Sequence, residues 1–536
     1  PKGKAPRPQN FVVNRKESPV FREYDLIISA IGSRSRMPVK KVKGVFYAGD
    51  MILGSATVVE AVATGKNAAL EADAYIAGEK PPRFANRAKS HVDLAGLNLC
   101  PVPLDAEFFG RKIRSPFLLS AAPHTDGYAQ MRKAYEAGWS GGVMKTAFDN
   151  VPIHIPSEYM TVFGPSTYAN CDNVSGHDLD RVCQEVGQLV SEFPDRLTLA
   201  STGGPVTGHD EADKAVWQSN TRKLESAGAM GVEYSLSCPQ GGDGTEGDIV
   251  SQNAELAARI IDWVMEASSN DNPKLFKLTA AVTSIQPIIK RIQQVFAKYP
   301  GKKGGVTLAN SFPSLAFRRR LPEVAGAQPL GCRTAGARPG SELLQPKGCA
   351  PVPPNWRWEE GVVVGMSGEG VLPISNLTLA KVSGMGVAVS GNGGPMNYKA
   401  AANFLALGAQ TVQFCTIAMK YGVGIVGELH SGLSFLMEER GFKSVKELIG
   451  AALPNPITDF MALSATKKLP HVDAALCEHC GNCTRCPYQA ITLNSRKVPQ
   501  FDPALCIGCS LCAQKCFAGA ISMRPRTARE LAALKH

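Results

Sequence analysis

The sequence CEHCGNCTRCP occupies residues 477–487, and CIGCSLCAQKC occupies residues 506–516. Each stretch places three cysteines at successive C-x2-C steps and a fourth close behind them. A doubled run of this kind is how a small domain holds two [4Fe–4S] clusters, with the fourth cysteine of each run crossing to the other cluster. The expected ligand sets are Cys477, Cys480, Cys483 and Cys516 for one cluster, and Cys506, Cys509, Cys512 and Cys486 for the other.

Paired zinc sites or disulfides are the alternative interpretation of these cysteines. Zinc sites usually include histidine or separate two C-x2-C pairs by a longer loop, so the doubled run favours clusters. One gap departs from the usual pattern: Thr484 and Arg485 alone separate Cys483 from Cys486, where three residues are typical.

Length and composition are those of a large α/β protein in a reducing compartment. The 536 residues are 44% hydrophobic, with 52 glycines and a net charge of +11. Seven further cysteines and no long apolar stretch predict a cytoplasmic protein without a membrane span. Lysine and arginine are scattered, so we do not expect nucleic-acid binding. The basic N-terminus lacks an initiator Met, and we expect the chain to be truncated there.

Residues 1–80 contain the pattern of a dinucleotide-binding module. Residues 24–32 and 44–50 are predicted strands, the second ending at Asp50, and residues 57–69 are a predicted helix. An acid that reaches a sugar hydroxyl, followed by a helix N-terminus facing phosphate, suits such a cofactor, although any buried α/β edge would give the same pattern. The segment resembles the C-terminal part of the FAD module of glutamate-synthase-small-subunit-like flavoproteins. Their Gly-rich front half is absent, so only part of an FAD site is expected.

Beyond a connector at residues 81–100, eight short apolar runs alternate with helical stretches. This alternation predicts a (β/α)8 barrel over residues 101–460, with its chemistry at the C-terminal strand ends. The runs are 117–121, 142–146, 197–201, 232–238, 274–279, 305–310, 386–391 and 411–416.

Three kinds of residue at the strand ends suggest a flavin site. Lys145 and Lys277 would place positive charge where a reduced flavin becomes anionic, although surface lysines are the simpler interpretation. Cys238 could donate a proton to one carbon while a flavin delivers hydride to its neighbour, or it could be a buried structural cysteine. Four glycines are expected at the last two βα turns of the barrel, at its phosphate site or as simple turn residues: Gly365, Gly368, Gly393 and Gly394.

Five motifs carry a resemblance to a known family. They are LSAAP at 119–123, MKT at 144–146, LSCP at 236–239, FKLT at 276–279 and GMSG at 365–368. Together they resemble, in order, the FMN barrel of dihydropyrimidine dehydrogenase, which shares its fold with dihydroorotate dehydrogenases. The order of FAD-module tail, barrel and ferredoxin domain at 468–525 is also similar to the C-terminal half of that enzyme.

The resemblance implies roles for individual residues. Cys238 falls at the catalytic cysteine, and Asn170, Asn310 and Ser311 fall at pyrimidine-binding positions. Residues at FMN-contacting positions are Ala121, Ala122, Lys145, Thr146, Lys277, Ser367, Gly368, Gly393, Gly394, Cys415 and Thr416.

The sequence also departs from the family. The family has Asn where this chain has Ser235, a substrate-facing position, and Thr where it has Ser311. The loop at 240–247 is more acidic than expected. Residues 318–358 lack strand or helix periodicity and are expected to be a lid, an insertion or the product of a misread frame.

We therefore expect an iron–sulfur flavoenzyme that reduces a C=C bond of a pyrimidine-like ring. Electrons would pass from NAD(P)H through FAD and the clusters to FMN, with the missing FAD/NAD(P)H module on the absent N-terminal sequence or on a partner subunit. By the resemblance, a homodimer is expected. The alternatives are the same machinery acting on dihydroorotate, a purine-derived heterocycle or an enoate, and a non-catalytic electron-transfer subunit.

Overall fold

The computed structural model describes residues 42–54, 57–81, 83–84, 99–149, 155–171, 174–237, 249–318 and 359–534. The predicted strand at 24–32, Cys238 with its loop at 240–247, and most of the 318–358 stretch lie outside these ranges. In the described residues, no helix is both long and apolar enough to cross a bilayer.

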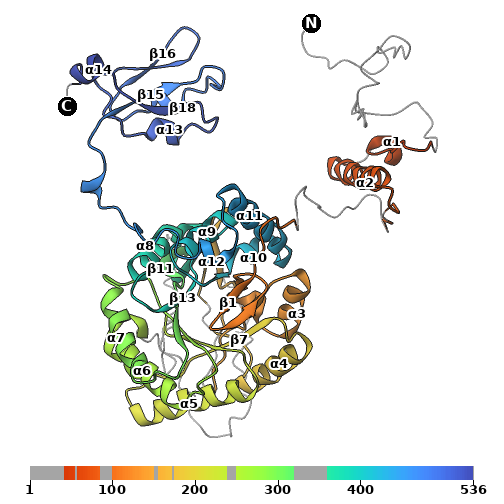
Figure 1. Ribbon diagram of the computed structural model, residues 1–536, viewed down its shortest axis with the longest axis vertical. Coiled ribbons are helices and arrows are strands. Elements are labelled where there is room, and N and C mark those ends of the chain that lie inside the picture. The colour runs from red at the N-terminus through yellow and green to blue at the C-terminus, as the bar shows by residue number, and fades with distance from the viewer. Residues whose placement is uncertain are drawn as a thin grey trace, which may run out of the picture.

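A closed barrel of eight parallel strands forms the centre of the chain (Figure 1), as the sequence predicted. Each strand pairs with the next one along the chain, and the last pairs with the first, so the sheet has no open edge. In order the strands are β3 (Phe117–Leu119), β4 (Gly141–Val143), β7 (Leu197–Thr202), β8 (Val232–Ser235), β9 (Lys274–Lys277), β10 (Gly304–Leu308), β13 (Ala388–Gly391) and β14 (Thr411–Phe414).

Helices return the chain from each strand to the next and cover the outside of the barrel (Figure 1). Their apolar faces and the outward strand residues form one continuous core, which includes Trp139, Trp217 and Phe404. The helices are α3 (Tyr128–Ala137), α4 (Leu179–Glu192), α5 (Asp210–Ser226), α6 (Ala254–Ala267), α7 (Gln286–Phe296), α8 (Leu372–Val382), α9 (Tyr398–Ala406), α10 (Thr416–Tyr421), α11 (Val426–Glu439) and α12 (Val445–Leu448).

The inside of the barrel contains an apolar cluster and a polar network. The hairpin of β1 (Ala106–Phe108) and β2 (Arg111–Ile113) packs Phe108 and Ile113 against buried leucines of β3, β7 and β9. The cluster of polar side chains includes Glu233, Thr307 and Gln413. Because alternate strand residues point inward, Leu197 and Leu199 serve the apolar cluster, and Ser201, two residues further on, bonds Thr146.

A four-stranded antiparallel sheet is inserted into two of the barrel connections. Its order is β11 (Phe312–Arg318), β12 (Glu360–Gly368), β6 (Thr167–Asn170) and β5 (Met160–Gly164). The strands β11 and β12 pair from Phe312↔Met366 to Arg318↔Glu360. The described residues on either side of the 318–358 stretch are therefore the two arms of one hairpin.

This sheet corrects the expected place of two glycines. Gly365 lies inside β12, and Gly368 ends β12 just before the short 3₁₀ turn Glu369–Val371 that leads into α8. Both therefore belong to the connection after the sixth barrel strand, because β12 is an inserted strand and not a member of the barrel. Gly393 and Gly394 follow β13, the seventh barrel strand, as predicted.

The N-terminal segment agrees with the sequence only in part. The predicted helix is present as α2 (Val58–Ala77), and the Thr57 hydroxyl and the Glu60 carboxylate form a capping box at its start. Residues 44–50 do not form the predicted strand, and Asp50 instead begins the short helix α1 (Asp50–Leu53). A strand needs a neighbouring strand to pair with, and none of the strands in the described ranges pairs with this segment.

The C-terminal domain is a pair of small hairpins around the cysteine runs. The strands β15 (Lys468–Val472) and β18 (Ile521–Pro525) pair antiparallel, as do β16 (Ile491–Leu493) and β17 (Pro499–Phe501). The short helices α13 (Leu511–Gln514) and α14 (Ala528–Ala532) complete it. Its buried hydrophobic residues among those described are Leu469, Ala490, Ile491, Cys506, Ala520 and Ile521.

Candidate active site and cluster sites

The two lysines predicted to face a flavin are buried at the carboxyl ends of barrel strands. Lys145 is 7% exposed and Lys277 is 5% exposed, so the surface-lysine interpretation is wrong for both. The ammonium of Lys145 lies 3.9 Å from Asp126, and that of Lys277 lies 3.5 Å from Glu233. Two cations are thus held at one end of the barrel, each beside a carboxylate.

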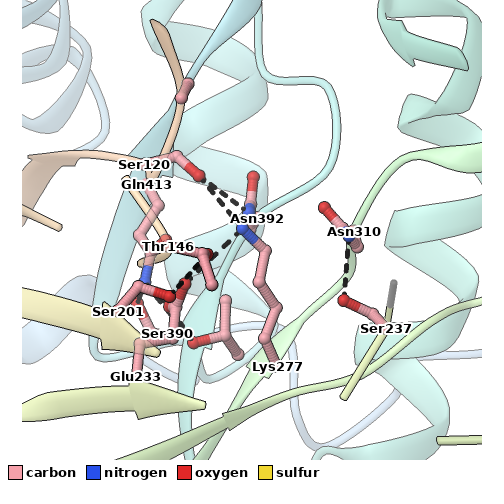
Figure 2. A network of polar contacts seen from close by, with 12 residues as sticks. Ser120, Thr146, Ser201, Glu233, Ser237, Lys277, Asn310, Ser390, Asn392 and Gln413 are labelled. Atoms are coloured by element: carbon pink, nitrogen blue, oxygen red, sulfur yellow. Dashed lines mark hydrogen bonds and ion pairs between the residues drawn. The ribbon is translucent and has the colours of Figure 1, made fainter. Parts of the chain in front are cut away.

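Lys277 reaches the mouth of the barrel through a hydrogen-bonded chain (Figure 2). Its ammonium donates to Ser120 Oγ at 3.3 Å, and Asn392 Nδ2 donates to the same oxygen at 3.2 Å. Asn392 Oδ1 in turn accepts from the backbone N–H of Gly393 at 2.7 Å. Strands β3, β9 and β13 therefore fix one lysine next to the glycine turn that follows β13.

Gly394 makes a backbone-to-backbone contact that a side chain would prevent. Its φ is +100°, and a Cβ there would lie 2.3 Å from the carbonyl oxygen of Gly368 and 3.0 Å from the N–H nitrogen of Leu372. Gly368 and Gly393 also have positive φ angles. The two connections meet at the start of α8 with bare backbone between them, which is the kind of cradle that accepts a phosphate.

Cys415 and Thr416 follow the last barrel strand beside this cradle. Thr416 Oγ1 donates to Ser367 Oγ at 3.0 Å, which ties the two predicted contact residues together. Burial raises the pKa of the Cys415 thiol to about 11, and the charges of Lys277 and Lys145 oppose that rise. The positive charges of both lysines therefore lie close enough to act on the buried Cys415 thiol, which is protonated at neutral pH.

The residues at predicted substrate positions gather where the inserted sheet meets the barrel. Asn170 pairs with Gly365 across the sheet, and a Cβ on Gly365 would lie 2.5 Å from Ser311 Oγ. Asn310 Nδ2 donates to Ser237 Oγ at 2.8 Å, as Figure 2 shows. Asn310 thus contacts the residue directly before Cys238.

Ser235 lies inside the barrel beside Lys277. It is 2% exposed, and its register partner on β9 is Lys277. A serine at this position fills less space than an asparagine would. Three more residues at predicted FMN-contacting positions lie at strand ends: Ala121 and Ala122 follow β3, and Thr146, whose Oγ1 lies 2.8 Å from Ser201 Oγ, follows β4.

Sequence reasoning missed Glu233, Gln413, Ser120 and Asn392, which make up much of this network. One signal was available for Glu233. It lies in the apolar run VEYS of β8, two residues before Ser235, so strand alternation turns both toward the interior of the barrel.

The thiols that act electrostatically on Cys483 and on Cys512 are members of the set predicted for each. Burial raises the pKa of the Cys483 thiol, and Cys480, Cys477 and Cys516 raise it further. Burial likewise raises the pKa of Cys512 to about 11, with further contributions from Cys506 and Cys509.

A small cavity lies among the second set. Its lining includes all four cysteines of the second predicted set, Cys486, Cys506, Cys509 and Cys512, and also Cys483 of the first set. No three His, Cys, Asp or Glu side chains of the described ranges converge as ligands of one metal ion. A cubane does not require such convergence, because each of its cysteines binds a different iron atom. The grouping of the cysteines fits two clusters.

Comparison with known proteins agrees with this arrangement. Residues 499–522 match the model of the 4Fe-4S binding domain. The chain is 26% identical over 388 residues to the NAD-dependent dihydropyrimidine dehydrogenase subunit PreA of Escherichia coli, a match that covers 71% of this chain and 84% of that protein.

Two further relatives come from a plant and an archaeon. The chloroplastic dihydropyrimidine dehydrogenase (NADP(+)) of Arabidopsis thaliana is 24% identical, over 64% of this chain and 75% of its own. The catalytic subunit of dihydroorotate dehydrogenase B (NAD(+)) of Pyrococcus abyssi is 24% identical, over 65% and 99%. The chain is therefore similar to dihydropyrimidine dehydrogenases, as its motifs predicted, and it combines their type of barrel with a ferredoxin domain.

Proposed function

We propose that this chain is the catalytic part of an iron–sulfur flavoenzyme that reduces a C=C bond in a pyrimidine-like ring. The observation that carries the proposal is the convergence, at one end of the barrel, of two buried lysines with a side-chain-free glycine cradle. FMN, when bound, supplies hydride transfer to the substrate carbon. The ferredoxin domain would bring electrons from an FAD/NAD(P)H module on a partner subunit or on preceding sequence.

Each group of residues has a distinct task in this proposal. Gly368, Gly393 and Gly394 admit the phosphate to the N-terminus of α8, where N–H groups can bind it. Lys277 and Lys145 supply positive charge for an anionic reduced flavin. Asp50, predicted to serve the FAD site, has no part in the barrel chemistry.

The substrate is oriented by polar groups and protonated by a thiol. Asn170, Asn310 and Ser311 would bond the ring carbonyl and N–H groups, and leaving such groups unpaired is what rejects poor analogues. Cys238 would donate the proton, and its role remains a prediction from the sequence because it lies outside the described residues. The Asn310–Ser237 hydrogen bond links a predicted substrate-binding residue to the residue directly before Cys238 in the sequence.

The test is single-turnover reoxidation of the reduced flavin. Purified protein is reduced with dithionite under nitrogen, mixed with uracil or thymine, and followed at the flavin absorbance. We expect both pyrimidines to reoxidise the flavin, and we expect Cys238→Ala to retain FMN but slow this step by at least about 100-fold, a typical contribution of a general acid. Protein that binds no FMN would refute the proposal and favour a non-catalytic electron-transfer subunit.

A related heterocycle or enoate is the second candidate substrate, and Ser235 is the observation that favours it. Ser235 is buried beside Lys277, and its side chain is shorter than that of the asparagine found in the resembled family. Dihydroorotate (tested by reduction of the oxidised flavin), a purine-derived heterocycle and an enoate belong in the same experiment. Turnover with one of them, and none with uracil or thymine, would assign the chain to that substrate.

A further inference from the structure

Glu233 is a fully buried carboxylate in the interior of the barrel, directly behind Lys277 (Figure 2). Burial of a charge is costly unless other groups compensate it. The groups that contact the Glu233 carboxylate therefore indicate the role of this residue. Neither the motifs nor the tasks assigned to the substrate-binding residues account for it.

The two oxygens of the Glu233 carboxylate have different partners. Oε2 accepts hydrogen bonds from Thr307 Oγ1 at 2.7 Å and from Gln413 Nε2 at 2.8 Å. Oε1 accepts no hydrogen bond, and it faces the ammonium of Lys277 at 3.5 Å. One oxygen is thus anchored to β10 and β14, and the other is left for the lysine.

Lys277 therefore lies between a fixed negative charge and the barrel mouth. On the mouth side it donates to Ser120 Oγ at 3.3 Å. Within the barrel, where water is excluded, a charge a few ångströms away has a much larger effect than it has at the surface.

Building on the proposed function, we propose that Glu233 acts through Lys277: its negative charge beside the ammonium offsets part of the charge of Lys277 and lowers the reduction potential of the flavin bound at the mouth. Reduction adds negative charge to the flavin. Lys277 favours that charge and Glu233 opposes it, so the pair sets a potential lower than the lysine alone would give.

The experiment compares the midpoint potential of bound FMN in the wild-type protein and in Glu233→Gln. The amide keeps the shape of the side chain and removes its charge, while Ser120 still holds Lys277. We expect FMN to remain bound and its potential to shift in the positive direction. An unchanged potential, or a negative shift, would overturn the proposal.

Thr307→Val is the matched control, because it removes one hydrogen bond to Oε2 and leaves the charge of Glu233 in place. We expect its potential to stay at the wild-type value. If Thr307→Val shifts the potential as much as Glu233→Gln does, the effect is one of barrel structure and the proposal fails.

Misfolding of the variant and loss of FMN binding have separate consequences. If Glu233→Gln does not fold, Glu233→Asp replaces it: the charge moves back by one methylene, a smaller positive shift is expected, and no shift or a negative one refutes the role. Wild-type protein that cannot bind FMN would refute the proposed function itself. If FMN binds and its midpoint potential is the same in Glu233→Gln as in the wild-type protein, only the inference about Glu233 is refuted.

Discussion

At the scale of single residues, burial decides chemical character. The ring of His430 stacks on Phe117, and its Nε2 is 2.8 Å from Ser115 Oγ. Burial lowers the pKa of His430 to about 4, and it lowers the pKa of His124 to the same value. Neither position could be distinguished from an exposed histidine by its sequence context.

These two histidines predict a loss of stability in acid. Their folded pKa values lie below the ordinary 6.5, so their contribution is complete above pH 6.5 and is lost as the pH falls toward 4. At pH 5 the loss of unfolding free energy is about 2 kcal/mol for each histidine. Urea unfolding at pH 7.5 and pH 5 measures it. His430→Gln should remove about half of this loss, and the exposed His471→Gln should leave it unchanged. An equal loss of unfolding free energy in all three proteins would contradict the assignment.

Gly394 gives a second prediction at this scale. Gly394→Ala should weaken FMN binding by at least about tenfold, because its Cβ would meet the Gly368 carbonyl at 2.3 Å and a left-handed φ costs an L-residue about 1 kcal/mol more. Gly422→Ala is the control, because Gly422 has φ +81° with nothing within 4 Å of its Cβ position. Equilibrium titration of the apoprotein with FMN compares them, and equal affinities would count against the cradle.

At the scale of elements, each strand divides its residues between two environments. On β8, Tyr234 stacks on Phe276 in the outer core, while Glu233 and Ser235 point into the barrel. In the ferredoxin domain, the segment between β18 and α14 contains a buried arginine that ties three parts of the domain together. There Arg526, which is 8% exposed, donates hydrogen bonds to backbone carbonyls of Pro503, Cys506 and Glu530.

Arg526→Ala should therefore loosen the second cysteine run. It leaves three carbonyl groups without their charged donor, a cost of roughly 2–4 kcal/mol for a domain with a very small core. We expect the iron and acid-labile sulfide per chain to fall clearly below wild type. Arg529→Ala, on the exposed side of α14, should keep the wild-type content. Unchanged iron in Arg526→Ala would refute this role.

At the scale of the whole molecule, the two principal domains depend on different sources of stability. The barrel has an extensive apolar core between its strands and helices. The buried hydrophobic residues in the described part of the ferredoxin domain are few: Leu469, Ala490, Ile491, Cys506, Ala520 and Ile521. A core of that size does not stabilise a domain by itself, so the clusters must supply much of its folding energy.

Removal of iron should consequently unfold one domain and leave the other. After oxidative treatment with a chelator, we expect hydrogen exchange of residues 468–525 to rise to the rate of an unfolded chain, while β3, β7 and β9 keep their protection. Reconstitution with iron and sulfide should restore the protection. Protected hairpins in the iron-free domain would contradict this dependence.

The sequence by itself determined the repeating and local features of this protein. The eight apolar runs specified the barrel, and the C-x2-C spacing predicted a ferredoxin domain, which the match of residues 499–522 supports, because strand alternation and ligand spacing operate over a few residues. The inserted sheet escaped prediction, since β12 pairs with both β6 and β11 across long sequence separations. Asp50 was wrongly placed at a strand end because a strand depends on a neighbour that its own sequence does not name.

Only the tertiary structure decided which residues form the network at the barrel mouth. Ser120, Glu233, Lys277 and Asn392 come from four different strands or their ends, and closure of the sheet brings them together. The contact between Gly368 and Gly394 likewise joins two separate connections. Charged residues distant in sequence influence one another strongly only when the fold brings them together and excludes water, because a Coulomb interaction over a few ångströms is much stronger at low dielectric than in water.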